Sequence, residues 1–227
     1  MMRKKILMSW SSGKDSAWAL YCLLQNPAFE VVGLFTTVNE EFHRVSMHGV
    51  RQELLKLQAQ SVDLPLAIIS LPNPCSNEQY NQIMASFLEQ AKKRGVTAMA
   101  FGDMLLKDVR DFREQQLKKL GMEAIFPLWG LNTHLIPYDM VNAGVRALIT
   151  CLDSQKIAPH VAGLELTPAL LSALPNEVDP SGENGEYHTF VFDGPMFKYP
   201  LLVKVGEVIT REHLVFADLL IDKACPQ

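Results

Sequence analysis

Residues 7–16 read LMSWSSGKDS, a hydrophobic segment that ends at Trp10 and is followed at once by small and charged side chains. The segment before the change has the continuous apolar character of a strand buried on both faces. After the polar residues, an apolar helical pattern occupies 16–25. A polar turn between a buried strand and a helix is either an ordinary helix start or an anion site, because free N–H groups of the first helical turn converge there.

The alternation of short apolar runs with helical patterns continues through the first two-thirds of the chain. After a strand at 5–10, further apolar and β-branched runs predict strands at 29–38, 64–71, 96–103, 123–129 and 145–152. Between them, helices are predicted at 48–60, 76–94, 107–120 and 133–143. Ser76 and Gln79 form a capping-box pattern at the start of one of them. We therefore expect an α/β fold, a parallel doubly wound sheet with helices on both faces.

The sequence changes character after Asp153, where prolines and glycines become frequent. A short helix at 167–173, a loop and strand at 182–197 and two further apolar runs predict a smaller mixed α+β region. We divide the chain into a larger domain at 1–152 and a smaller C-terminal region at 153–227. The last apolar runs either pack on the sheet or form the seam of a homodimer; they occupy 201–209 and 213–221.

Composition and charge restrict the classes of function. The 227 residues are 48% hydrophobic and 20% charged, which is typical of a globular protein. A net charge of −4 argues against nucleic acid as a partner, because nonspecific binding requires an excess of Lys and Arg. The four cysteines form no C-x-x-C pair, which argues against a zinc site and fits a reducing compartment.

The apolar runs also bear on the cellular location. The run near the N-terminus is too short for a signal peptide, and none reaches the ~18 residues of a membrane span. We therefore expect a cytoplasmic protein with no membrane partner.

Three stretches are predicted to meet at one edge of the sheet, because ligands of such sheets bind beyond the carboxyl ends of the strands. They are 11–16, 36–39 and 102–103. In the first, the serines offer hydroxyl donors, Gly13 permits positive φ and close approach, and Lys14 adds a mobile positive charge. Asp15 fits beside phosphates only if it caps the helix or binds a metal ion.

The loop lacks the Walker A pattern, since Met8 stands where its first glycine is required and Asp15 follows the lysine. It resembles instead the PP-loop, S-G-G-x-D-S, of the N-type ATP pyrophosphatases, which split ATP between the α and β phosphates. The resemblance implies an adenine nucleotide alpha hydrolase-like fold and a loop that binds the pyrophosphate portion of ATP. Ser12 replaces the first glycine, and positive φ costs serine more than glycine.

Residues 182–189 read GENGEYHT and form the second candidate site. Glu183 and Glu186 are suited to bind Mg²⁺ or to orient an incoming amine, and the alternative is a polar hairpin loop with both carboxylates in water. If a strand begins at Tyr187, its side chain and that of His188 face opposite sides, so only one of them faces the site.

Together the two motifs resemble the diphthine–ammonia ligase family, a branch of the PP-loop proteins. Further matching stretches are FGD (101–103), KDVRDFRE (107–114), FPLWG (126–130) and DGPMF (193–197). The resemblance implies that ATP adenylates a substrate carboxylate and that ammonia then displaces AMP. It implies ATP and Mg²⁺ as cofactors, and ammonia and a carboxylate as substrates, the carboxylate borne by protein-bound diphthine or by a small molecule.

The predicted site residues follow from both motifs. Catalytic roles are assigned to Lys14, Asp15, Glu183 and Glu186, and Asp15 and Glu183 are also the predicted metal ligands. Nucleotide binding is assigned to Ser9, Ser11, Ser12, Gly13, Lys14, Asp15, Ser16, Thr36, His48, Gly102 and Asp103. Substrate binding is assigned to Arg110, Arg113, Gly185, Tyr187 and His188.

Several of these assignments have alternatives. A water-exposed position at a helix start is the alternative for His48, and a solvated helix face with Asp111 and Glu114 is the alternative for the two arginines. Two other functions stay open for the whole chain: a tRNA-modifying PP-loop ATP pyrophosphatase, and a nucleotide-binding sensor without chemistry.

Overall fold

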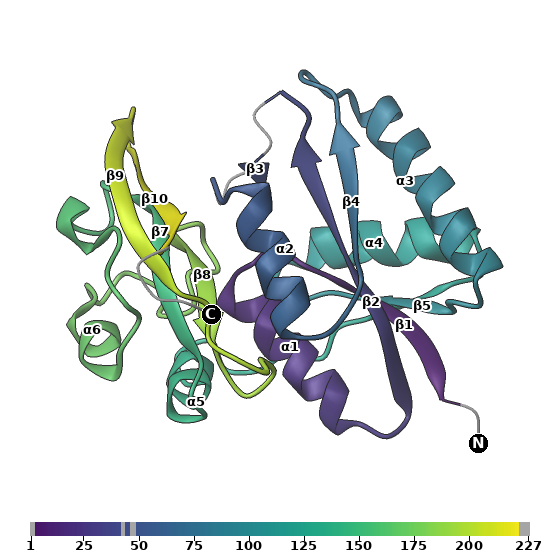
Figure 1. The fold of residues 1–227 in the computed structure, drawn as a ribbon, viewed down its shortest axis with the longest axis horizontal. Helices are drawn as coiled ribbons and strands as arrows, with labels where there is room; N and C mark the ends of the chain where they lie inside the picture. The colour runs from purple at the N-terminus through teal and green to yellow at the C-terminus, as the bar shows by residue number, and fades with distance from the viewer. Residues whose placement is uncertain (1–2, 42–43, 46–48, 223–227) are drawn as a thin grey trace.

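The computed structural model describes residues 3–41, 44–45 and 49–222, which form two sheets side by side (Figure 1). His48, predicted to bind nucleotide, lies outside the described residues. The larger sheet and its helices correspond to the βαβ series expected from the sequence, and the smaller sheet is built from the C-terminal part of the chain.

Five strands of the first sheet run parallel in the order β4-β2-β1-β5-β6. They are β1 (Lys4–Ser9), β2 (Phe29–Asn39), β4 (Leu66–Leu71), β5 (Ala98–Ala100) and β6 (Glu123–Ile125). The short β3 (Arg44–Val45) pairs antiparallel with the end of β2 and was not expected from the sequence. The helices are α1 (Lys14–Gln25), α2 (Gln52–Ser61), α3 (Asn77–Lys93) and α4 (Lys107–Lys119).

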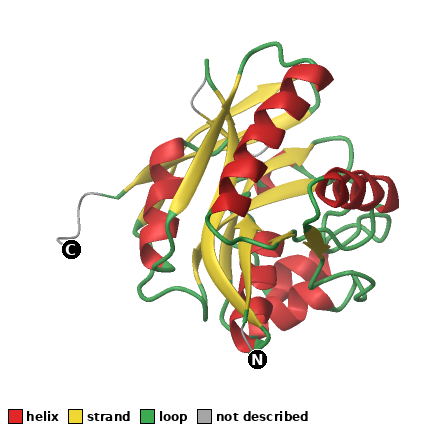
Figure 2. Ribbon diagram, turned by 90° about the vertical axis from the view of Figure 1, so that its right-hand side faces the viewer, coloured by secondary structure: helices red, strands yellow, loops and turns green. Residues whose placement is uncertain are grey.

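Helices cover both faces of this sheet, as predicted (Figure 2). Ala98 and Ala100 of β5 belong to the core that includes α1 and α2, whereas Met99 and Phe101 belong to a second cluster with α3 and α4. This alternation follows from the period of two along a strand. The capping box of α3 is also confirmed, since Ser76 accepts from the backbone N–H of Gln79 at 3.2 Å.

The strand order places a topological switch point between β1 and β5. From β1 the chain proceeds to β2 and β4 on one side, and it then returns to form β5 and β6 on the other side. Connections leave the two central strands in opposite directions, which opens a crevice at their carboxyl ends. The loop 11–16 follows β1 and residues 102–103 follow β5, so both predicted stretches lie at this crevice.

The second sheet is antiparallel in the order β8-β7-β10-β9. It contains β7 (Arg146–Asp153), β8 (Tyr187–Asp193), β9 (Val203–Arg211) and β10 (Leu214–Ile221), with α5 (Ile136–Asn142), the 3-10 turn Pro159–Val161 and α6 (Pro168–Ala173) around it. The strand predicted at 145–152 was assigned to the parallel series, and that assignment is wrong. Its apolar run has the same appearance in either kind of sheet, because periodicity does not reveal strand direction.

The predicted division of the chain at residue 152 stays a prediction. It falls within β7, which ends at Asp153 and belongs to the second sheet. The two last apolar runs form the β9–β10 hairpin of that sheet. Homodimer formation through them also stays a prediction.

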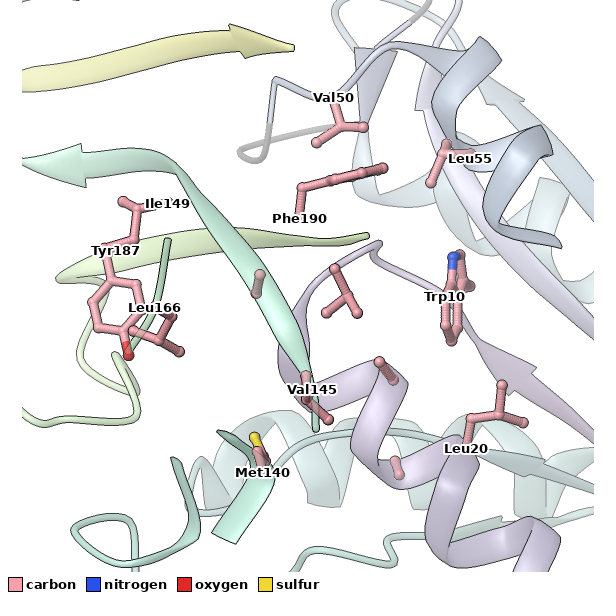
Figure 3. Packing of buried hydrophobic residues seen from close by; sticks show 14 of the residues in the cluster. Trp10, Leu20, Val50, Leu55, Met140, Val145, Ile149, Leu166, Tyr187 and Phe190 are labelled. Atoms are coloured by element: carbon pink, nitrogen blue, oxygen red, sulfur yellow. The ribbon is translucent and has the colours of Figure 1, made fainter. Parts of the chain in front are cut away.

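A continuous hydrophobic core joins the two sheets. Phe190 of β8 extends toward Val50 and Leu55 of the first domain (Figure 3), and all three side chains are buried. Burying one such side chain contributes about 1.5–3 kcal/mol. At the edge of this contact Arg51 and Asp218 form an ion pair between α2 and β10. The sheets therefore pack as one body, which fixes β8 against the loop after β1.

Within the described part of the chain, no helix is long and apolar enough to cross a membrane.

Candidate functional site

The loop after β1 adopts a different backbone shape from the expected one. Ser12 has φ +76°, whereas Gly13 is extended with φ −86° and ψ 171°. The prediction that Gly13 supplies the positive φ is therefore wrong, and Ser12 adopts the left-handed conformation. Ser16 Oγ donates to Gly13 O at 2.9 Å, and Ser11 Oγ lies 3.2 Å from Ser16 Oγ. These two hydroxyls therefore stabilise the turn itself.

Strand β8 bonds directly to this loop. Ser12 O accepts from Val191 N at 2.9 Å, and Lys14 N donates to Thr189 Oγ1 at 3.0 Å. Gln58 Nε2 of α2 donates to the same Ser12 oxygen at 3.1 Å. The two sequence motifs, although about 170 residues apart, are therefore one structural unit.

Lys14 is fixed rather than mobile. Its side chain is buried, and its Nζ lies 2.9 Å from both carboxylate oxygens of Asp15. The ammonium also donates to the backbone oxygen of Ser181 and lies 5.4 Å from the ring centre of Tyr187. The expectation that Lys14 supplies a mobile positive charge is therefore wrong. The negative charge of Asp15 is balanced by the Lys14 ammonium. Asp15 does not cap the helix, since α1 has no side-chain cap at its N-cap residue Gly13.

Gly102 is required for packing against the loop. A Cβ atom at this position would lie 2.9 Å from the Asp15 carbonyl carbon and 3.0 Å from Ser16 N. The 2.9 Å distance is shorter than real Cβ contacts, so a side chain at 102 would require the first turn of α1 to shift. Asp103 follows, and burial raises the pKa of its carboxyl while the nearby Arg113 guanidinium lowers it.

The two predicted substrate-binding arginines both stack on aromatic rings. Arg113 lies 4.1 Å from the ring centre of Phe101 and pairs with Asp103, with 3.3 Å between Nε and Oδ2. Arg110 lies over Trp129 at 4.5 Å and pairs with Glu114 at 2.7 Å. Each arginine combines a cation–π contact with an ion pair. Three matched stretches, FGD, KDVRDFRE and FPLWG, thereby contact one another. The pair of Arg110 with Glu114 also fits the solvated-face alternative, so substrate binding by the two arginines stays a prediction.

The two glutamates of GENGEYHT lie in different environments. Glu186 is fully buried, and its carboxylate accepts from Asp179 N at 3.2 Å, Asn184 N at 2.9 Å and Asn184 Nδ2 at 3.2 Å. It shapes its own loop. Glu183 is half-buried, and its pKa is raised to about 7 by burial and then by the Asp15 carboxylate, against the opposing charge of Lys14.

Tyr187 and His188 complete this loop. The Tyr187 ring lies beneath Lys14, and its hydroxyl donates to the backbone oxygen of Pro180. Burial, followed by the Lys14 charge, lowers the pKa of His188. Gly185 has φ +77° and open space where a Cβ would stand, so its backbone conformation rather than packing favours glycine.

A cavity of about 610 Å³ opens beside the loop, between α3 and α4 at the carboxyl edge of the first sheet. Ser9, Ser11, Thr36 and Arg113 line it, and their assignment to nucleotide or substrate binding stays a prediction. Much of the remaining lining is apolar and includes Phe35, Met84, Phe101 and Phe112. Its volume matches that of small-molecule sites. Lys14, Gly102, Asp103, Arg110 and Glu183 lie outside this lining.

No three His, Cys, Asp or Glu side chains gather as a metal site in the ranges that the structure describes. Mg²⁺ nevertheless commonly binds through one or two carboxylates together with phosphate oxygens. Asp15, Asp103 and Asp179 all act electrostatically on Glu183, with Lys14 as the opposing charge. This surplus of negative charge is what a divalent cation would balance, so the residues present fit Mg²⁺.

Sequence reasoning missed Gln58, Thr189, Asp179 and Ser181. Gln58 is fully buried, and it lies on the apolar face of α2 together with Leu54. A glutamine at that helical position is a detectable signal, because a polar residue within a buried stripe requires hydrogen-bond partners. Thr189 is the last residue of the GENGEYHT motif but was assigned no role, whereas Asp179 and Ser181 lie in a loop and give no comparable signal.

The crevice at the switch point and the Ser11–Ser16 loop define a protein of the PP-loop α/β class. Residues 2–124 match the diphthamide synthase N-terminal domain, and residues 169–225 match the diphthamide synthase C-terminal domain. The chain belongs to the diphthamide synthase family, which confirms the resemblance deduced from its motifs.

Its relatives include three proteins named diphthine–ammonia ligase. The Schizosaccharomyces pombe protein is 28% identical over 92% of this chain and 37% of its own length. The Bos taurus protein is 25% identical and the Homo sapiens protein 24% identical, each over 91% of this chain and 85% of its own length. The chain therefore spans little more than a third of the yeast relative and most of the mammalian ones.

Proposed function

We propose that the chain is an ATP-dependent amide-forming ligase, which adenylates a substrate carboxylate and transfers ammonia to it. The observation that supports this proposal best is the direct bonding of β8 to the Ser11–Ser16 loop, because it brings Glu183 close enough to Lys14 and Asp15 for their charges to act on it. The names of the relatives support the same class of reaction.

In this proposal ATP lies across the carboxyl edge of the first sheet. The adenosine portion occupies the apolar cavity near Phe35 and Phe101, with Ser9 and Thr36 as polar contacts. The pyrophosphate portion lies over the loop, where the N–H groups at the start of α1 and the helix dipole favour anions.

The substrate carboxylate attacks the α-phosphorus in line, and the bond to the β-phosphate oxygen breaks. Pyrophosphate leaves with its charge partly balanced by Lys14, which is held close to the loop by Asp15 and Ser181. Asp15 is the residue that would hold Mg²⁺ together with phosphate oxygens, and the ion would supply further charge neutralisation. Positioning and electrostatics account for most of such catalysis.

Ammonia then attacks the acyl carbon, the bond to AMP breaks, and the nitrogen loses one proton. We assign that proton to Glu183, because its pKa of about 7 lets it accept a proton near neutral pH. Glu186 is assigned a positioning role instead, since its carboxylate oxygens bind the backbone of its own loop.

Chromatography of the products after incubation with ATP, Mg²⁺, ammonium and a cell extract tests this proposal. We expect AMP and pyrophosphate, and ADP with phosphate as products would refute it. Tracing of ¹⁵N-ammonium into the extract, followed by mass identification of the labelled product, would identify the acceptor as protein-borne diphthine or a small carboxylate. AMP formation that requires tRNA would instead favour a tRNA-modifying enzyme. ATP binding without any turnover would favour a nucleotide-binding sensor.

A further inference from the structure

Gln58 belongs to neither sequence motif, yet it bonds to the loop and to the segments on both sides of it. Its side chain is fully buried in α2, and its Oε1 accepts from the indole Nε1 of Trp10 at 2.8 Å. Its Nε2 donates to Ser12 O at 3.1 Å and to Val191 O at 2.6 Å. One side chain of α2 thus joins Trp10, which follows β1, to the loop and to β8.

Trp10 determines which way the Gln58 amide is turned. An indole N–H can only donate, so the amide atom that it meets must be the oxygen. The NH₂ group therefore points at two backbone carbonyls, Ser12 O and Val191 O, which can only accept. Each polar atom of the amide has a partner, as expected for a buried glutamine.

The orientation of the Ser12–Gly13 peptide follows from these contacts. Ser12 O is held by two donors, Gln58 Nε2 and Val191 N. In a trans peptide the C=O and the following N–H point in opposite directions. Gly13 N–H is therefore turned away from α2 and β8, toward Ser11 Oγ at 3.4 Å, and Ser11 lines the cavity.

We propose that Gln58 is a positioning residue, which holds the Ser12–Gly13 peptide with its N–H toward the site of the pyrophosphate portion of ATP. The inference rests on the proposed function for the identity of the anion, and on the hydrogen bonds alone for the peptide orientation. Ser12 makes such support necessary, because a non-glycine residue at φ +76° is strained and would relax if its carbonyl were released.

The test compares the full chain with Gln58→Met, which keeps the length of the side chain but removes its donors and acceptor. Titration calorimetry with inorganic pyrophosphate is expected to show at least tenfold weaker binding for the variant, while adenosine binding stays within twofold. A purely structural role would weaken both ligands equally or neither. Gln60→Met, at an exposed position two residues further along α2, is the control and should leave both affinities unchanged.

Hydrogen exchange of residues 9–16 supplies a measurement that needs no ligand. Gln58→Met should exchange these amides at least tenfold faster than the wild type, and unchanged exchange would overturn the positioning role even if the wild-type protein forms no AMP. Wild-type pyrophosphate affinity in Gln58→Met would overturn it as well. If that variant does not fold, Trp10→Phe keeps Gln58 but removes its orienting donor; faster loop exchange is expected, and wild-type exchange would refute the inference.

Discussion

Replacing Glu183 by glutamine should stabilise the folded protein in neutral and alkaline solution while impairing the proposed reaction. The pKa of Glu183 is raised from its ordinary 4.5 to about 7, first by burial and then by Asp15. As pH rises from about 4.5 to 7, the unfolded chain loses this proton before the folded one does, so stability falls. One pKa unit corresponds to about 1.4 kcal/mol, which sets an upper limit of roughly 3 kcal/mol.

Because Glu183 is only half-buried, water screens part of this cost, and we expect Glu183→Gln to gain about 1–3 kcal/mol relative to the wild type between pH 4.5 and pH 8. Urea unfolding of both proteins at the two pH values measures this difference. Glu207→Gln, at an exposed position of β9, is the control and should show no such change. A Glu183→Gln stability difference that is the same at both pH values would refute the reasoning.

Substitutions at three further positions test the loop and its packing. Ser12→Gly should raise the free energy of unfolding by about 1 kcal/mol, because it relieves the positive φ and removes a buried hydroxyl that has no hydrogen-bond partner among the described residues. Ser12→Ala should be stabilised by less, because it removes the hydroxyl but keeps the positive φ. Urea unfolding measures both effects, and a destabilised glycine variant would contradict this reasoning. Gly102→Ala should lose about 1–3 kcal/mol in the same assay, because its Cβ would overlap the Asp15 backbone, and wild-type stability would argue against that contact. Lys14→Ala should lower the rate of AMP formation at least ~100-fold with the fold retained by circular dichroism, and unchanged turnover would exclude its proposed role.

Much of the first sheet could be predicted from the sequence, because its strands are continuous apolar runs and its helices carry clear periodicity and caps. The Ser76 capping box and the alternation along residues 98–101 illustrate this, since each depends on neighbours in sequence. The placement of the loop at the carboxyl edge also followed, because strand direction alone fixes that edge, whereas the switch point depends on the strand order, which the sequence did not predict.

Long-range features could not be predicted in the same way. The pattern of β7 fits either sheet, and only tertiary pairing with β8 and β10 decides between them. Positive φ fell on Ser12 rather than on Gly13, because bonds from Val191 and Gln58 to the Ser12 carbonyl outweigh the intrinsic preference of glycine. Glu183 and Glu186 look alike in sequence, and their different environments depend on which carboxylate meets backbone donors.

The bond between Val191 and Ser12 has a consequence for the modularity of this chain. The two family domains match separate parts of the chain. However, the Ser12 carbonyl of the N-terminal loop accepts a hydrogen bond from Val191 N, which belongs to the C-terminal domain. A fragment that ends near residue 124 would leave that carbonyl with one fewer donor and Lys14 without the Ser181 oxygen. A chimaera of two family members should therefore keep the loop conformation only if the loop and β8 come from the same parent, because each of the two segments stabilises the conformation of the other.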